Sequence, residues 1–571
     1  MFATSGGSSA LAHFVRTSSR SCSTTKVTTV VYKTRRSLPI NVRLTSTHAA
    51  RVLLQFAVFV AMLLLLAWAP AGYAAPKPSP EPIEAPSLAM GVEALHAAGI
   101  TGAGVTVAVV DSGLAPLGQS WSRLPDGSLM LQHPSGKRNF IVYRDFVAPT
   151  GDDSSDPNGH GTHVVSTIGN NRPLRLSGKG AMGVAPGVNL VVARALAADG
   201  SASYQTVIDA IDWVIQQRAT YNIRVLNLSL YAPIASPYWA DPLGRAVMRA
   251  WQAGIVVVAA VGNGGPAAAT VTVPGNVPYV ISVGALRSAN FTDSGADELA
   301  QFSSRGPTES AFAKPDLLAP AVRVVAPMPD GSTLARIAGM GRLREKATLD
   351  LWAAASKQDV GYFQLSGSSM AAAEVSGLAA LLLQSEPTLT NNQVKHRLMA
   401  TSRLARTSSG GAAAYSIWEQ GAGLVQARAA IASQSQAAAN SGMDLAADLD
   451  LNGRLHYWGL TSYDAATSSF GLPPLAGTPA SYLIWSGAGR AWAGAEWSGD
   501  PEVWAGAGRA WAGAGRAWAG AGQSWTGEAE LWAGAGRAWA GALPPTPLSQ
   551  AHSELERDTY NVALPLVRSS P

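Results

Sequence analysis

The chain has 571 residues, of which 47% are hydrophobic and 14% are charged. This length exceeds one ordinary domain and allows at least one sizeable buried core. The formal net charge of +5 originates at the N-terminus, because eight of the 42 Lys and Arg residues, and no Asp or Glu, lie in residues 1–51. The rest of the chain holds 34 basic against 37 acidic residues. Its charge therefore argues against a nucleic-acid partner.

The N-terminal segment has the organisation of a secretory signal. Basic residues 1–51 precede an apolar run, residues 52–68, and small residues that suit cleavage near Ala74 follow it. That order predicts export with residues 1–74 removed. The alternative is a membrane anchor, for which 17 apolar residues is at the short limit. The single cysteine, Cys22, lies in the same segment, so we expect a secreted or extracellular protein without disulfides, or one associated with the cell envelope.

Short β-branched runs alternate with amphipathic segments in the next part of the chain. The runs are residues 105–110, 189–196, 225–230, 254–262 and 279–285. Between them, residues 203–219 and 241–254 carry apolar side chains at helical spacing. Continuous apolar strands separated by helices predict an α/β fold, in which a parallel sheet is covered by helices on both faces. Functional residues are then expected at the carboxyl ends of the strands.

Four polar residues stand at strand ends or helix starts of this pattern. Asp111 follows the first run, and Asn263 follows "VVVAAVG". His160 lies in a Gly-flanked turn before a helix, and Ser369 precedes the helix formers of "SGSSMAAAEVSG". Each residue alone is typical of an ordinary turn or helix cap. Together they supply an acid, an imidazole, an amide and a hydroxyl to one edge of the sheet.

These four residue types suit nucleophilic catalysis by serine. A serine hydroxyl needs a base at neutral pH, and a histidine with a reference pKa of about 6.5 meets that need. A carboxylate on the other ring nitrogen orients the imidazole. We therefore assign Ser369 as nucleophile, His160 as base and Asp111 as the orienting acid. The Asn263 amide and the Ser369 backbone N–H are the expected donors to an oxyanion.

The sequence blocks around these residues resemble the signature blocks of the subtilisin-like serine proteases. They are "VAVVDSG", "NGHGTHVVSTI", "VVVAAVGN" and "SGSSMAAAEVSGLAALLL", in that order. The resemblance covers about residues 88–430 and is closest to the secreted bacterial members. It implies a subtilisin-like fold and an endopeptidase that acts on proteins or peptides through an acyl-enzyme. It also implies a structural role for His163.

The resemblance further implies a substrate groove between two strands, each of which pairs with the substrate backbone. One strand matches Ser229, Leu230 and Tyr231, and the facing strand matches Gly200, Ser201 and Ala202. Tyr231 stands where the family normally has Gly and is expected to narrow the groove. The apolar surroundings imply a broad, apolar primary specificity.

The nucleophile block and the segment before it depart from the family pattern. The chain has Ser368, Ala373 and Glu374 where relatives usually have Thr, Pro and His. Glu374, five residues after Ser369, is expected to face away from it and toward a polar partner. Residues 323–363 are longer than the usual link and are expected to form a surface helix, with a substrate-contacting rim as the alternative.

The sequence also bears on the propeptide and on bound ions. Only 36 residues separate Ala75 from Asp111, so we expect no folding-assistant propeptide domain of the kind that many relatives carry. The chemistry requires no cofactor. Structural calcium is common in the family, but Asp152, Asp153 and Asp156 form only a loose acidic loop, and we assign no metal ligands.

The C-terminal region carries a Trp/Gly repeat in residues 485–542, with a unit close to "WAGAGRA" and a period of seven. Two Gly per unit disfavour a helix, by about 1 kcal/mol each. One short strand and a Gly turn per repeat is the expected structure. A low-complexity spacer is the equal alternative. Exposed Trp side chains would suit contact with a cell surface, a polysaccharide or a partner.

These features divide the chain into six parts. They are the basic segment and signal (1–74), a Pro-rich linker or short pro-segment (75–87), the peptidase domain (88–435), a connecting segment (436–484), the repeats (485–542) and a tail (543–571). We expect a monomer. The leading hypothesis is a secreted serine endopeptidase. The alternative is an inactive protease-fold binding or scaffold protein attached to the cell surface through its Trp repeats.

Overall fold

A computed structural model gives the fold of the chain. It describes residues 86–117, 120–132, 139–149, 151–171, 183–287, 297–338, 360–407, 411–450, 455–464, 466–467 and 469–473, and the strand segments 484–485, 524–526 and 561–563. All of these belong to one compact unit, Pro82–Pro571. The predicted signal, residues 1–74, lies outside the described residues.

A ten-stranded sheet forms the centre of the described structure, in the order β10-β9-β8-β7-β1-β5-β4-β3-β2, with β11 also paired to β9. The strands are β1 (Thr106–Asp111), β2 (Ser122–Arg123), β3 (Leu129–Gln132), β4 (Phe140–Asp145), β5 (Asn189–Arg194), β7 (Ile223–Leu228), β8 (Val256–Ala260), β9 (Ile281–Arg287), β10 (Glu298–Leu299) and β11 (Leu317–Pro320). Strands β4, β5, β1, β7, β8 and β9 pair in parallel. The predicted parallel α/β sheet is confirmed.

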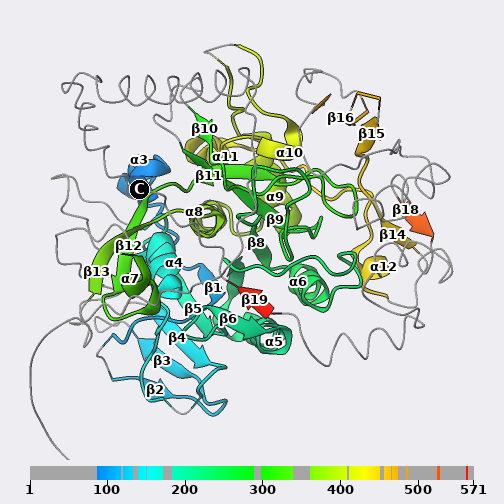
Figure 1. The fold of residues 1–571 in the computed structure, drawn as a ribbon. Helices are drawn as coiled ribbons and strands as arrows, with labels where there is room; N and C mark the ends of the chain where they lie inside the picture. Colours follow the sequence, from blue (N-terminus) through cyan, green and yellow to red (C-terminus); the bar gives the residue numbers. More distant parts are fainter. Residues whose placement is uncertain are drawn as a thin grey trace, which may run out of the picture. The chain divides into compact units, whose positions relative to one another are not determined.

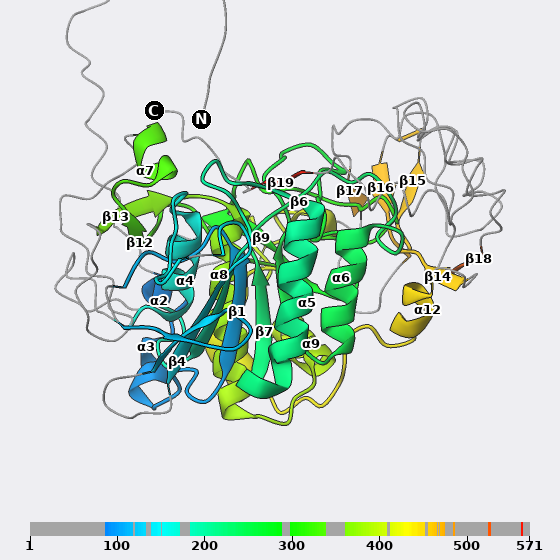
Figure 2. The same cartoon turned by 90° about the horizontal axis from the view of Figure 1, so that it is seen from below.

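Helices cover both faces of the sheet (Figure 1). They are α2 (Pro86–Ala89), α3 (Glu93–Ala97), α4 (His160–Gly169), α5 (Tyr204–Tyr221), α6 (Pro242–Gln252), α7 (Thr333–Ala338), α8 (Ser368–Ser385), α9 (Asn391–Ala400), α10 (Ile417–Gln420), α11 (Ala427–Ala432) and α12 (Leu445–Leu449). Helices α5 and α6 lie side by side on one face (Figure 2), and α4 and α8 pack together on the other. Because both faces are covered, every residue of β1, β5 and β8 is buried.

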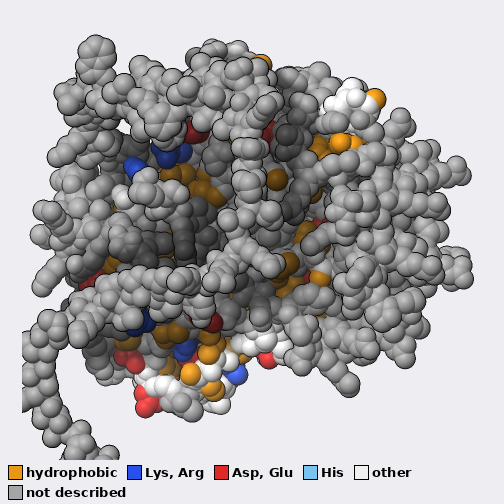
Figure 3. All heavy atoms as spheres, in the orientation of Figure 1, with side chains coloured by type: hydrophobic (Ala, Val, Ile, Leu, Met, Phe, Trp, Pro, Cys, Tyr) orange, Lys and Arg blue, Asp and Glu red, His pale blue; other side chains and the backbone are white. Residues whose placement is uncertain are grey.

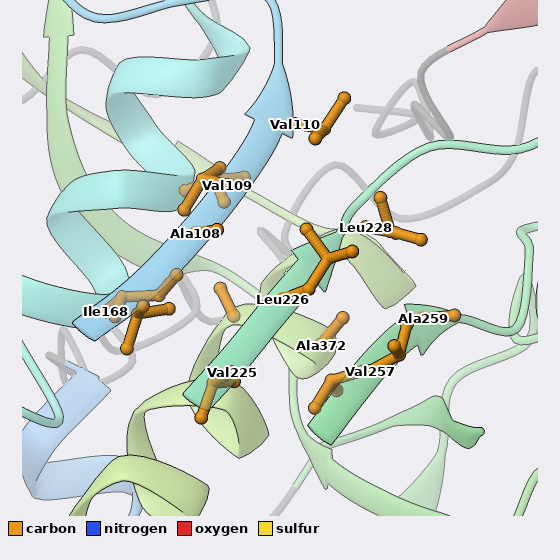
Figure 4. Close-up of a cluster of buried hydrophobic side chains, with 14 of the residues drawn as sticks. Ala108, Val109, Val110, Ile168, Val225, Leu226, Leu228, Val257, Ala259 and Ala372 are labelled. Atoms are coloured by element: carbon orange, nitrogen blue, oxygen red, sulfur yellow. The ribbon is translucent and has the colours of Figure 1, made fainter. Parts of the chain in front are cut away.

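The core fills both faces of the sheet at β1, β7 and β8. Val109 of β1 shares one face with Ile168 of α4 and Ala372 of α8 (Figure 4), whereas Leu226 of β7 and Val257 of β8 pair with each other and lie on the opposite face. All five side chains are fully buried. Burying an aliphatic side chain of this size contributes about 1.5–3 kcal/mol, less for alanine. This packing fixes the strand ends that carry the candidate site.

The surface over β2–β4 mixes charges of both signs with hydrophobic side chains, at the lower edge of the view in Figure 3. Arg123 pairs there with Asp152 at 2.6 Å, and Arg144 pairs with Asp126 at 3.4 Å. Such exposed pairs contribute about 0–1 kcal/mol. This part of the surface therefore presents no field of one sign.

The remaining described strands form small sheets. They are β12 (Val324–Pro329) with β13 (Val360–Leu365), β14 (Leu455–Tyr457) with β18 (Ser524–Thr526), β15 (Ser462–Asp464) with β16 (Ser469–Gly471) and β17 (Ile484–Trp485), and β6 (Ser201–Ser203) with β19 (Asn561–Ala563). Two of these strands, β17 and β18, carry Trp residues of the predicted repeat. Most of the repeat lies outside the described residues and its structure stays a prediction. None of the described helices has the length and apolar character that crossing a bilayer requires.

Candidate active site

The four predicted site residues lie at strand ends and helix starts. Asp111 is the last residue of β1, and His160 is the first residue of α4. Asn263 lies just beyond β8, and Ser369 is the second residue of α8. Helices α4 and α8 pack against each other, so the sheet edge and the two helix starts converge.

Asp111 and His160 are in direct hydrogen-bond contact. The His160 Nδ1 atom lies 2.8 Å from Asp111 Oδ1 and 3.0 Å from Oδ2, and both side chains are fully buried. The Ser112 backbone N–H also donates to Asp111 Oδ1, at 2.7 Å. A carboxylate on Nδ1 favours the tautomer that carries its proton there. Nε2 is then the free base.

Asp156 holds the turn that presents His160. Its Oδ1 accepts from the Ser112 hydroxyl and from the Gly159 N–H, both at 2.8 Å. Its Oδ2 accepts from the Thr162 N–H at 2.7 Å and from the Thr162 hydroxyl at 2.6 Å. Gly159, the N-cap of α4, has a φ of 101° and no side chain to cap the helix. Asp156 supplies that cap, and its negative charge suits a helix N-terminus.

The acidic loop of Asp152, Asp153 and Asp156 therefore has three separate sets of protein partners. Asp152 pairs with Arg123, and Asp153 accepts from the Trp121 ring N–H at 2.7 Å. Within the described part of the chain, no three His, Cys, Asp or Glu side chains are grouped as a metal site would need.

Ser369 and Ser229 are joined by two hydrogen bonds, one donated by each hydroxyl. The Ser369 hydroxyl donates to the Ser229 carbonyl at 3.2 Å, and the Ser229 hydroxyl donates to the Ser369 carbonyl at 2.8 Å. The His160 Nε2 atom is buried and has no hydrogen-bond partner among the described residues. The structure thus does not form the serine–histidine hydrogen bond. A rotation about the Cα–Cβ bond of Ser369 is needed to direct the hydroxyl away from Ser229.

A further network ties the Ser229 hydroxyl to the body of α8. The Asn227 side-chain N–H₂ donates to the Ser229 hydroxyl at 2.9 Å, and the Ser376 hydroxyl donates to Asn227 Oδ1 at 2.9 Å. All three side chains are fully buried. Asn227 and Ser376 were not predicted from the sequence. Asn227 could have been found as the polar residue inside the otherwise apolar run "VLNLSL". A buried polar side chain requires a hydrogen-bond partner, which here is Ser376.

Asn263 contacts the start of α8. Its Oδ1 accepts from the Ser368 N–H at 2.9 Å, which leaves its amide nitrogen as the donor group of the side chain. The N-cap of α8, Gly367, makes no side-chain cap. The first N–H groups of a helix have no partner within it, and Ser369 contributes one of them. This end of α8 therefore carries partial positive charge beside two directed donors.

The two predicted groove strands lie in different surroundings. Ser229 and Leu230 are fully buried, whereas Tyr231 is half-buried. Ser201 and Ala202 are half-buried in β6, and Gly200 precedes them with a φ of 86°. Both Ser201 and Ala202 therefore retain some exposed surface.

The segment before β6 is tied to the predicted catalytic residues. The Ala195 N–H donates to the Asp111 carbonyl at 2.8 Å. The Asn158 side-chain N–H₂ donates to the Ala198 carbonyl at 3.1 Å. Asn158 is two residues before His160, so the start of β6 lies beside the turn that carries the base.

The described parts of residues 323–363 include two strands and a short helix. β12 and β13 pair antiparallel, and α7 follows β12. The N–H groups of Thr333 and Leu334 donate to the carbonyls of Pro157 and Asn158 at 2.9 and 3.0 Å. The segment thus supports the turn before His160. In α8, Glu374 is fully buried.

Burial keeps His163 neutral. Its pKa is lowered from 6.5 to about 3 by burial and, secondarily, by the neighbouring His160. The unfolded chain binds a proton at this side chain below about pH 6.5, whereas the folded chain does so only near pH 3. The free energy of unfolding therefore falls as the pH drops through this window, by up to about 1.4 kcal/mol per pH unit.

We expect His163→Gln to flatten this part of the pH dependence. In a Ser369→Ala background, which removes self-digestion, the protein that keeps His163 should lose about 2–3 kcal/mol between about pH 7 and pH 4.5 through this group, and the His163→Gln variant should lose that much less. Urea unfolding at the two pH values measures the difference. Equal losses in the two proteins would show that His163 does not couple protonation to unfolding.

Comparisons with known proteins match the same part of the chain. The profile of the Subtilase family matches residues 102–433, more than half of the chain. Serine protease AprX of Bacillus subtilis (strain 168) is 36% identical over 52% of this chain and 61% of that protein. Subtilisin of Bacillus pumilus is 34% identical over 54% of this chain and 87% of that protein. The match to the crystal structure of a cold adapted subtilisin-like serine proteinase covers 55% of this chain and 88% of that chain. The two chains share 28% sequence identity over the match, with a TM-score of 0.36.

The extent of these matches differs among the relatives. The chain spans about six-tenths of the length of AprX and of subtilisin E from Bacillus subtilis (strain 168), but 87% of the subtilisin from Bacillus pumilus. The matched residues contain all four signature blocks and the strands and helices that carry them. The chain belongs to the Subtilase family.

Proposed function

We propose that this protein is a secreted serine endopeptidase that hydrolyses peptide bonds through an acyl-enzyme. The observation that carries the proposal is the buried Asp111–His160 pair, with Nδ1–Oδ distances of 2.8 and 3.0 Å. Ser369 at the start of α8 and Asn263 beside it complete the chemistry. Membership of the Subtilase family supports the same reaction.

In the first half of the reaction, the Ser369 hydroxyl turns from the Ser229 carbonyl toward His160 Nε2. Its oxygen attacks the scissile carbonyl carbon while Nε2 takes the proton. Asp111 stabilises the imidazolium that forms. The negative oxygen of the tetrahedral intermediate accepts hydrogen bonds from the Asn263 amide and the Ser369 N–H. The C–N bond then breaks, and His160 gives its proton to the leaving amine.

In the second half, water replaces the amine. His160 Nε2 takes a proton from the water as its oxygen attacks the acyl carbon, and the same donors stabilise the second intermediate. The ester bond to Ser369 then breaks, and His160 returns the proton to the serine oxygen. No metal ion or organic cofactor is required for these steps.

The substrate is proposed to bind as an extended strand between Ser229–Tyr231 and Gly200–Ala202. Backbone pairing makes binding tolerant of sequence, since it uses groups that every residue has. Tyr231 narrows the groove where relatives carry Gly. A broad, apolar primary specificity follows from the uncharged groove segments "NLSLYAP" and "AAVGNGG".

Export is proposed to remove residues 1–74, with the mature protein outside the cell and monomeric. The Trp residues of 485–542 are proposed to contact a cell surface or a polysaccharide. The inactive scaffold alternative rests on Tyr231 and the altered nucleophile block. Both hypotheses predict the same fold. Only the endopeptidase hypothesis predicts a serine that His160 activates.

Hydrolysis of unfolded casein tests the proposal. The protein should cleave casein at many sites, and Ser369→Ala should abolish the cleavage. Ser385→Ala, at an exposed position near the end of the same helix, is the matched control and should retain full activity. Equal cleavage by the Ser369→Ala protein would reveal a contaminating protease, and a folded wild-type protein that cleaves nothing would support the scaffold alternative.

A further inference from the structure

The edge of β6 carries a strand from the C-terminal end of the chain. β19 (Asn561–Ala563) pairs antiparallel with β6, and the opposed residues are Asn561 with Ser203, Val562 with Ala202 and Ala563 with Ser201. Figure 1 shows β19, in red, beside β6 and the start of α5. Among the described residues, β6 pairs in a ladder with no other strand.

This pairing uses the same backbone that the proposed function assigns to substrate. One edge of a strand offers a single row of N–H and C=O groups and can pair with only one strand at a time. While β19 pairs with Ser201–Ser203, an extended substrate cannot pair with the same edge of β6. On that edge, β19 and substrate are mutually exclusive.

The direction of β19 leads toward the predicted catalytic residues. Because the pairing is antiparallel, Ala563 lies opposite Ser201, at the start of β6. The residues before β6 contact the site: Ala195 donates to the Asp111 carbonyl, and Ala198 accepts from Asn158. β19 thus enters from the far end of β6 and runs toward the end that is tied to Asp111 and to the turn before His160.

The reacting groups are in a closed, unproductive arrangement. The side chains of His160 and Ser369 have 0% exposure, although substrate and water must reach both. The Ser369 hydroxyl donates to Ser229, and His160 Nε2 has no hydrogen-bond partner among the described residues. Both features must change before hydrolysis can occur.

The composition of residues 561–567 suits a strand at the edge of β6. Residues 561–567 read "NVALPLV" and carry no charge. Val at the centre of β19 favours a strand. An uncharged stretch also matches the uncharged groove segments that the proposed function assigns to substrate binding.

We propose that Asn561–Ala563 is a built-in competitive inhibitor, which occupies the β6 edge of the substrate groove and holds the protease in a low-activity state. The proposal rests on the proposed function, because it needs a substrate with which to compete. Tethering gives the segment an effective concentration of the order of millimolar, so even weak strand pairing competes with dilute substrate. Displacement or removal of the tail would release activity.

The full-length double variant Val562→Pro/Ala563→Pro tests the proposal. Neighbouring residues of an antiparallel strand alternate between bonded and non-bonded positions, so two adjacent prolines remove a ladder N–H in either case. The KM for a fluorogenic peptide with at least four residues before the scissile bond should fall about five-fold or more, with kcat unchanged. Ser553→Pro/Glu554→Pro, in the same tail but outside β19, should keep the wild-type KM.

Addition of the segment as a separate molecule provides a second measurement. A synthetic peptide of residues 559–567 should inhibit the double variant competitively, and the same peptide with both prolines should not. Wild-type KM should stay constant as the enzyme is diluted. A KM that falls on dilution would show that the tail pairs with a second copy and would overturn the intramolecular assignment.

Active-site labelling separates failure of this inference from failure of the proposed function. If a fluorophosphonate labels Ser369 in all three proteins and their KM values are equal, the inference is wrong and the protease assignment stands. If no folded protein is labelled, the protease assignment fails and the inference fails with it. A lower KM in the proline control as well would show a general effect of the tail and would overturn the role of β19.

Discussion

Replacing Asp111 by Asn should lower kcat for peptide hydrolysis about 10⁴-fold. The carboxylate lies 2.8 and 3.0 Å from His160 Nδ1 and accepts its proton in a hydrogen bond. An asparagine amide at the same place either donates to Nδ1 or presents a neutral oxygen. The first arrangement puts the imidazole proton on Nε2, which then cannot act as the base for Ser369. The second loses the charge that stabilises the imidazolium.

The substitution is nearly isosteric, so its effect on folding can be separated from its effect on chemistry. Asp209→Asn, at an exposed position in α5, is the matched control and should keep wild-type kcat. Single-turnover hydrolysis of an activated ester and circular dichroism of both variants complete the comparison. A folded Asp111→Asn protein with kcat within tenfold of wild type would contradict the assigned role of Asp111.

Replacing Asn263 by Ala should lower kcat about 10²–10³-fold, a loss of about 3–4 kcal/mol of transition-state stabilisation, with a small change in KM. The reason is that the amide donor acts on the oxyanion, which exists only in the transition state and the intermediate. The side chain also accepts a hydrogen bond from the Ser368 N–H at 2.9 Å, so the substitution removes a contact of α8.

Asn263→Asp separates these two contributions. Aspartate keeps an oxygen for the Ser368 N–H but replaces the donor by a second acceptor. Its kcat should fall at least as far as that of Asn263→Ala, whereas its stability should stay close to that of the wild type. If Asn263→Asp retained kcat while Asn263→Ala lost it, the residue would position α8 and would not bind the oxyanion.

The buried centre of the fold could be predicted from the sequence because its signal is local. Each of the five apolar runs overlaps a strand of the sheet, although 225–230 and 279–285 are each shifted by two residues, from β7 (Ile223–Leu228) and β9 (Ile281–Arg287). The strands β2, β3, β4, β10 and β11 were missed. β4 carries Arg144 and Asp145 in a six-residue strand, so it does not stand out as an apolar run.

The site could be predicted only to the level of residue types and their order. Asp111 and His160 were placed together because one ends a strand and the other begins a helix at the same edge. The bond from the Ser369 hydroxyl to the Ser229 carbonyl could not be predicted, because it depends on a side-chain rotamer. Asp156 was interpreted as part of a loose acidic loop, since its partners Ser112 and Thr162 become neighbours only in the folded chain.

The pairing of β19 with β6 has no signal in the sequence. Strand pairing between segments far apart in the chain depends on edge availability and register, and neither can be seen in a local pattern. The tail was assigned no function from its sequence. In the structure, it supplies the strand that occupies a predicted substrate edge.

The most direct test of the protease assignment is covalent labelling of the full-length protein by a fluorophosphonate near pH 8, with the adduct mapped by mass spectrometry. Our account predicts one adduct, on Ser369, and no labelling of the Ser369→Ala or His160→Ala proteins, because the probe reacts only with a serine that a neighbouring base activates. A folded wild-type protein that stays unlabelled, or an adduct that persists in Ser369→Ala, would contradict it.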